Sequence, residues 1–137
     1  MREITPYLNF DGSCREAMTF YQRCLGGELH VMTFADGGFD STPGAEERVL
    51  HARLVRGPTM LMASDTMPGT PYQQGTDIHL NFFLDSDEEV ETLYPALSEG
   101  GQEVMAPHDA FWGARFAMFV DRFGVHWMLN HERQPHG

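Results

Sequence analysis

A chain of 137 residues, 42% of them hydrophobic, is long enough to bury a core without disulfides or bound metal. Its formal net charge of −11 speaks against nucleic acid, which binds to basic surfaces, and no apolar stretch approaches the ~18 residues of a membrane-spanning helix. The N-terminus also lacks the basic and apolar regions of a signal peptide, so we expect a cytoplasmic protein with neither nucleic acid nor membrane as a partner.

The first half of the chain has the pattern strand, helix and three strands. Residues 4–10 form the first strand, and Ser13 and Glu16 indicate a capping box at the start of an amphipathic helix over 14–25. The following strands are predicted over 28–35, 48–56 and 59–64. Asp65, after the last of them, is interpreted as the start of a turn.

The second half repeats this order after a segment rich in turn-forming residues. A strand over 77–85 precedes a helix over 87–99, in which Pro95 predicts an irregularity. Three more strands are predicted over 102–106, 115–121 and 125–131, with a loop of large residues over 107–113.

The two halves share motifs as well as order. Tyr7-Leu8-Asn9-Phe10 matches His79-Leu80-Asn81-Phe82, and each is followed by Ser-x-x-Glu, an apolar helical stripe and a pair of glycines. The sequence therefore predicts one domain, 1–137, of two βαβββ modules, 1–66 and 77–132, joined by a linker over 67–76. The fold class is α+β.

Strand alternation predicts which side chains lie opposite the helices. Leu8 and Phe10 share the apolar parity and suit the helix side, which leaves Tyr7 and Asn9 on the other face. The same reasoning leaves His79 and Asn81 opposite the helix in the second module. A face that combines aromatic with polar groups is typical of a small-molecule cavity.

The remaining reactive residue types offer no complete catalytic constellation. Cys14 and Cys24 lie about 15 Å apart on one predicted helix, so both should be free thiols. His51 shares parity with Arg53 and can face the cavity. His126 could point either way.

Other polar positions have plainer interpretations. His108-Asp109 is read as ordinary loop polarity rather than an oriented base, because adjacent side chains seldom face each other. His131 and His136 are expected to be solvated in a frayed C-terminus. Aromatic and sulfur-bearing residues crowd the end of the chain and favour an apolar pocket, among them Trp112, Phe116, Trp127 and Met128.

The chain resembles the vicinal oxygen chelate superfamily, which includes glyoxalase I, bleomycin resistance proteins and extradiol dioxygenases, and within it the PhnB-like group. The resembling stretches are PYLNFDGSCREAMTFYQRCLGGEL, HARL, LMASDTMP and FWGARFAMFVDRFGVHWMLN. The resemblance implies two βαβββ modules forming a curved mixed sheet around a cavity, and a homodimer.

The resemblance also implies a divalent metal held by His, Glu or Gln from four strands. His79 matches one ligand position, whereas the others fall on Pro6 or Tyr7, on Met62 or Ser64, and on Met128. Methionine suits copper(I) rather than the harder ions of this chemistry. We therefore expect no cofactor.

Two functions stay open from the sequence. The first is metal-independent binding of a small apolar or aromatic molecule. The second is a metal-dependent enzyme of glyoxalase or dioxygenase type that uses His79. The cavity is predicted to be lined by Tyr7, Asn9, His51, His79, Asn81, Trp112 and Met128.

Overall fold

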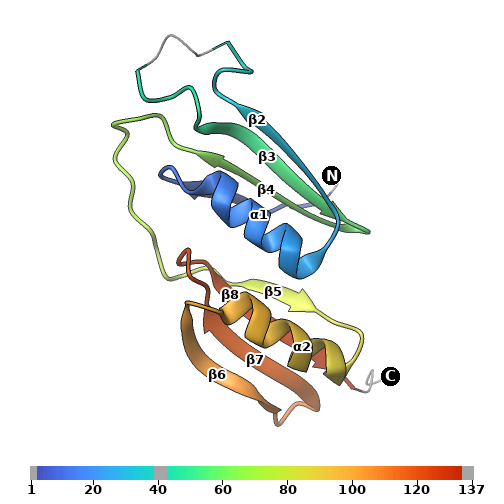
Figure 1. The fold of residues 1–137 in the computed structure, drawn as a ribbon. Coiled ribbons are helices and arrows are strands. Elements are labelled where there is room, and N and C mark those ends of the chain that lie inside the picture. Colours follow the sequence, from blue (N-terminus) through green and yellow to red (C-terminus); the bar gives the residue numbers. More distant parts are fainter. Residues whose placement is uncertain (1–2, 39–42, 134–137) are drawn as a thin grey trace. The chain divides into compact units, whose positions relative to one another are not determined.

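The computed structural model describes residues 3–38 and 43–133, in which the chain forms two compact units, Met1–Gln73 and Gln74–Gly137 (Figure 1). Each unit follows the order strand, helix and three strands and contains one four-stranded mixed sheet. The predicted α+β class and the βαβββ repeat are confirmed.

In the first unit the sheet order is β1-β4-β3-β2, with β1 parallel to β4 and the other pairs antiparallel. The elements are β1 (Tyr7–Phe10), α1 (Cys14–Leu25), β2 (Glu28–Thr33), β3 (Val49–Arg56) and β4 (Thr59–Asp65). Helix α1 buries Ala17, Met18 and Tyr21 completely against the sheet, where Ala52 and Ala63 leave room for it.

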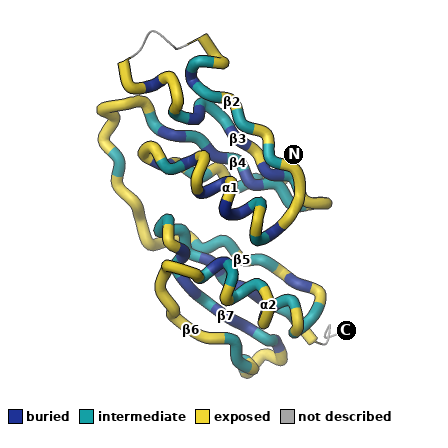
Figure 2. The backbone as a smooth tube through the Cα atoms, viewed as in Figure 1, coloured by how far each residue is buried: buried dark blue, intermediate teal, exposed yellow. Residues whose placement is uncertain are grey.

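The second unit repeats this topology with the order β5-β8-β7-β6. Its elements are β5 (Leu80–Phe83), α2 (Asp87–Ser98), β6 (Gln102–Asp109), β7 (Ala114–Val120) and β8 (His126–Glu132). Val90 and Leu97 of α2 are fully buried, as are Phe119 and Leu129 of the sheet. Figure 2 shows buried stretches along the central strand β7, whereas the edge strand β6 is largely exposed.

Several boundaries differ from the sequence prediction. The first strand of each unit starts three residues later than expected, at Tyr7 and Leu80. β6 continues to Asp109, so the first three residues of the predicted loop over 107–113 are strand. α2 runs through Pro95 and ends at Ser98, whose Oγ donates a hydrogen bond to the carbonyl of Tyr94 at 2.6 Å.

The predicted capping box at Ser13 is wrong, and a distant carboxylate holds the start of α1 through other N–H groups. Ser13 makes no side-chain cap, and the Asp65 Oδ1 atom accepts from the backbone N–H groups of Gly12 and Cys14 at 2.8 and 3.0 Å. Its Oδ2 atom accepts from the N–H of Val49 at 2.9 Å. Asp65 is thus a buried anchor between β4, β3 and the start of α1, and not a turn residue.

In the second unit the corresponding cap forms locally. The Ser86 Oγ atom accepts from the N–H of Glu89 at 3.1 Å, and the Glu89 carboxylate accepts from the N–H of Asp85 at 2.8 Å. The buried carboxylate of this unit, Asp121, instead holds the turn before β8. It accepts from two backbone N–H groups and from Trp127 Nε1 at 2.9 Å.

The glycine pair that follows each helix is explained by a close backbone approach. A Cβ atom on Gly27 would collide with the carbonyl oxygen of Val55 in β3, and one on Gly101 would collide with that of Val120 in β7. Both glycines precede the strand that pairs with this neighbour. The repeated glycines therefore let the helix return directly into the sheet.

A comparison of two neighbouring alanine substitutions tests this explanation. Gly26 and Gly27 both have a positive φ, which costs an alanine roughly 1–3 kcal/mol, but only Gly27 lacks room for a Cβ. We expect Gly27→Ala to lower the free energy of unfolding by about 1–3 kcal/mol more than Gly26→Ala, measured by urea denaturation. Equal losses would contradict the steric explanation.

Candidate functional site

Each sheet has one face covered by its helix and one face without a helix. The candidate site residues lie on the face without a helix. We call these the first and second helix-free faces, after their units. The first comprises His30 and Met32 of β2, His51 and Arg53 of β3, Met62 and Ser64 of β4, and Tyr7 and Asn9 of β1. The strand pairing places these side chains in register across the four strands.

Tyr7 and His51 are in direct contact on the first helix-free face. The Tyr7 hydroxyl lies 3.1 Å from His51 Nδ1, and the two rings are 5.8 Å apart between centroids. Tyr7 is 45% exposed, and Met32, paired with His51 on β2, is 46% exposed. The first helix-free face thus presents the polar pair of Tyr7 and His51 next to the adaptable thioether of Met32.

Asn9, the third predicted residue of this face, is exposed beside Ser64. Its backbone carbonyl accepts a hydrogen bond from the Tyr72 hydroxyl at 3.1 Å, which ties residue 72 to β1. No hydrogen bond of the Asn9 side chain is formed within the described part of the chain, so its amide is available to solvent or ligand.

The second helix-free face is more aromatic. Asn81 pairs with Met128 across β5 and β8, and Met128 pairs with Met118 of β7. His79 and His126, at the start of this face, pack edge to face with ring centroids 5.0 Å apart. This contact settles the side of His126, which the sequence left open.

Trp112 anchors an aromatic cluster at the other end of this face. Its ring lies 5.2 Å from Phe116 and 5.0 Å from Phe111, and Phe116 also packs against His108 at 5.9 Å. Phe111 is 97% exposed and Trp112 is 41% exposed. Large exposed aromatic side chains gathered in one place mark an interaction surface.

Asn130 is the functional candidate that the sequence analysis missed. It lies between Phe83 and Phe116 in the strand pairing and is 8% exposed, yet its Oδ1 atom has no hydrogen-bond partner among the described residues. A buried polar atom left without a partner costs roughly 1–3 kcal/mol. An asparagine two residues after Met128, on the same parity, is the only sequence signal that could have drawn attention to it.

The residues do not assemble the metal site of the superfamily within either unit. Over residues 3–38 and 43–133, no group of three His, Cys, Asp or Glu side chains is placed to hold a metal ion. His79 has the imidazole of His126 beside it, but Met128 and Asn81 occupy the adjoining positions, and Tyr7 is engaged with His51. Two imidazoles without a carboxylate are a poor match for the hard divalent ions of this chemistry.

The Cys14 thiol offers no alternative nucleophile. Cys14 is buried and free, and burial together with the nearby Asp65 carboxylate raises the pKa of its thiol to about 12. The protonated thiol is a weak nucleophile. Cys24, which is half-buried, forms no disulfide among the described residues, as predicted.

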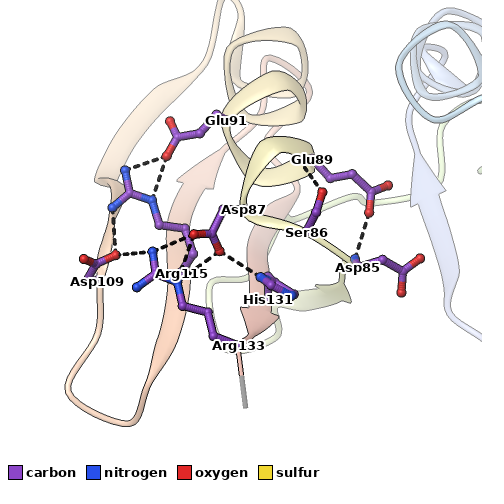
Figure 3. Close-up of polar contacts among 9 residues, drawn as sticks. All are labelled: Asp85, Ser86, Asp87, Glu89, Glu91, Asp109, Arg115, His131 and Arg133. Atoms are coloured by element: carbon purple, nitrogen blue, oxygen red, sulfur yellow. Dashed lines mark hydrogen bonds and ion pairs between the residues drawn. The ribbon is translucent and has the colours of Figure 1, made fainter. Parts of the chain in front are cut away.

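The helix-covered side of the second unit carries an ionic network (Figure 3). Arg133 binds Asp87 and Asp109, Asp109 also binds Arg115, and Arg115 reaches Glu91 of α2. The expectation of a solvated His131 is wrong, because its Nδ1 atom lies 2.8 Å from Asp87 in this network. His136 lies outside the described residues.

His108 and Asp109 do not face each other, as expected of adjacent strand residues. His108 Nδ1 lies 2.9 Å from the carbonyl of Ala106 and its ring packs on Phe116, whereas Asp109 binds the two arginines. The pair is therefore no catalytic dyad, and Asp109 is bound on the helix-covered side.

The match to known proteins identifies the family. Residues 4–129 match the Glyoxalase/Bleomycin resistance protein/Dioxygenase superfamily, and the chain belongs to it.

Among its relatives, the chain is 32% identical to protein YjdN of Escherichia coli K12 over 96% of both chains. It is 44% identical to protein PA1353 of Pseudomonas aeruginosa, whose crystal structure matches with a TM-score of 0.88 over 96% of this chain and 98% of that one. The PhnB protein of Bacillus cereus matches with a TM-score of 0.80 at 24% identity, over 95% and 99% of the two chains, and supports the fold.

Within the described residues, neither helix is long or apolar enough to cross a membrane.

The ionic network predicts a specific pH dependence of stability. Hydrogen bonds from Arg133 and then from His131 lower the pKa of Asp87 to about 2, from an ordinary value of 3.8. A depressed carboxyl pKa contributes stability that is present above pH ~4 and is lost as pH falls towards 2. In Arg133→Gln we therefore expect the urea midpoint to fall less steeply between pH 5 and pH 2 than in the parent.

The matched control is Arg53→Gln, which removes an exposed arginine of the first unit. Its pH dependence should follow the parent. Parallel curves for all three proteins would mean that the network contributes nothing to acid stability.

Proposed function

We propose that this protein binds a small apolar or aromatic molecule without the help of a metal. The observation that carries the proposal is the composition of the second helix-free face, where Trp112, Phe116 and Met128 accompany a few isolated polar groups. Ligand sites in proteins combine an apolar lining with a small number of placed polar groups. Methionine adapts to the shape of a ligand, and tryptophan offers a flat ring for packing.

The fold alone does not decide between binding and catalysis, because one fold supports many functions. The side chains favour binding. The Tyr7–His51 pair is the nearest approach to an acid–base group, but burial keeps the Cys14 thiol protonated. Apart from His79, the ligand positions that the resemblance implies fall on Pro6 or Tyr7, on Met62 or Ser64, and on Met128. The homodimer implied by the resemblance stays a prediction.

A binding titration tests the proposal. We expect metal-stripped protein in excess EDTA to bind flat aromatic probes such as 2-naphthol, measured by calorimetry and by a rise in the thermal midpoint. Trp112→Ala should weaken binding by about tenfold because the ring loses a packing surface worth roughly 1–1.5 kcal/mol.

Ile4→Ala is the matched control, since Ile4 is an equally apolar side chain, 95% exposed and outside either helix-free face. It should bind like the parent. Failure of flat aromatic probes to bind would overturn the proposal.

The alternative enzyme has one observation in its favour, the contact between His79 and His126. It predicts that activity or binding disappears with EDTA, returns with zinc, nickel, iron or manganese, and is lost in His79→Ala. Binding that is unchanged by EDTA and by His79→Ala would exclude a metal from the site.

A further inference from the structure

The unpaired oxygen of Asn130 points to the chemistry of the ligand. Asn130 lies within β8, is more than nine-tenths buried, and its Oδ1 atom accepts no hydrogen bond from the described residues. Its neighbours in the strand, Leu129 and His131, contact the helix side, so strand alternation aims the amide at the second helix-free face. A buried acceptor on a candidate binding face is a position where a ligand can supply the missing donor.

The surroundings of this oxygen are aromatic. Phe116 lies opposite Asn130 on β7, and Phe83, 60% exposed, lies opposite it on β5. Trp112 packs on Phe116 from the loop before β7. A ring placed against these side chains would bring a substituent at its edge to the amide oxygen.

The charges nearby favour a neutral donor. Asp109 and Glu91 are bound to arginines on the helix-covered side of the sheet. On the helix-free side, His108 is engaged by the carbonyl of Ala106. Glu132, two residues along β8 on the same parity, is exposed to solvent, which screens its charge. A cationic ligand would therefore lose its hydration at the buried Asn130 oxygen with little gain from an opposite charge.

We propose that Asn130 forms a subsite for aromatic ligands that carry a neutral N–H or O–H donor, such as a phenol or an indole. The donor bonds to Asn130 Oδ1, and the ring packs against Phe116 and Trp112. This proposal rests on the proposed binding function and assigns its specificity to one side chain. A site with a buried polar group rejects ligands that leave this group unpaired.

Two probes that differ in the donor alone test the proposal. 2-Naphthol carries an O–H group, and 2-methoxynaphthalene has the same rings without a donor. We expect the parent protein to bind 2-naphthol at least about tenfold more tightly, measured by fluorescence titration in EDTA. In Asn130→Leu, which has a similar shape but no acceptor, the preference should fall to less than about twofold, while 2-methoxynaphthalene binds as before.

Two controls separate recognition from folding. Thr92→Leu removes an exposed polar side chain of α2, outside the helix-free face, and should keep the preference. Asn130→Leu should unfold at the same temperature as the parent or higher, because it removes a buried polar atom that has no partner.

The outcomes distinguish the two proposals. Equal binding of both probes by the parent, or a preference that survives in Asn130→Leu, would overturn the assignment of Asn130 and leave the binding function intact. Binding of neither probe would overturn both. Loss of binding of both probes in a folded Asn130→Leu would also contradict the assignment. The substitution would then have disturbed the packing of the rings rather than the hydrogen bond to the donor.

Discussion

The constraint on which this structure depends is that each four-stranded sheet is accompanied by a single 12-residue helix. One helix covers one face, so every strand divides its side chains between a helix-covered core and a face without a helix. Leu8 and Phe10 take the helix-covered side and Tyr7 and Asn9 the other, and the same division recurs at Leu80 and Asn81 in the second unit. The candidate functional residues on the strands follow from this division, and Trp112 joins them from the loop before β7.

Two buried carboxylates make the division rigid. Asp65 binds three backbone N–H groups and fixes the start of α1 to β3 and β4, and Asp121 fixes the turn before β8 together with the indole of Trp127. Because these carboxylates lie on or beside the helix-covered cores, the opposite faces are not needed to hold the fold together in the same way. Asn130, buried but unpaired, is the exception that suggests a ligand.

The features that depend on the alternation of neighbouring side chains were predicted from the sequence. The features that depend on residues far apart in the chain were missed. The strand parities, both helices and the repeated glycines could be read from neighbouring residues. The start of α1 could not, because it is held by Asp65, a carboxylate more than fifty residues away that accepts from the N–H groups of Gly12 and Cys14. His131 was misjudged because its partner Asp87 lies on another element, and Asn130 was missed because an absent hydrogen bond appears only when three strands are assembled.

The two tryptophans of the chain allow the central claim to be tested directly, since Trp112 lies in the aromatic cluster of the second helix-free face, whereas Trp127 is buried on the helix-covered side. The measurement is a titration of ¹⁵N-labelled protein with 2-naphthol, following both indole N–H signals by NMR. The account predicts that the Trp112 signal shifts with saturation while the Trp127 signal, held by Asp121, stays in place. Saturable binding that shifts Trp127 as far as Trp112, or leaves Trp112 unmoved, would contradict it.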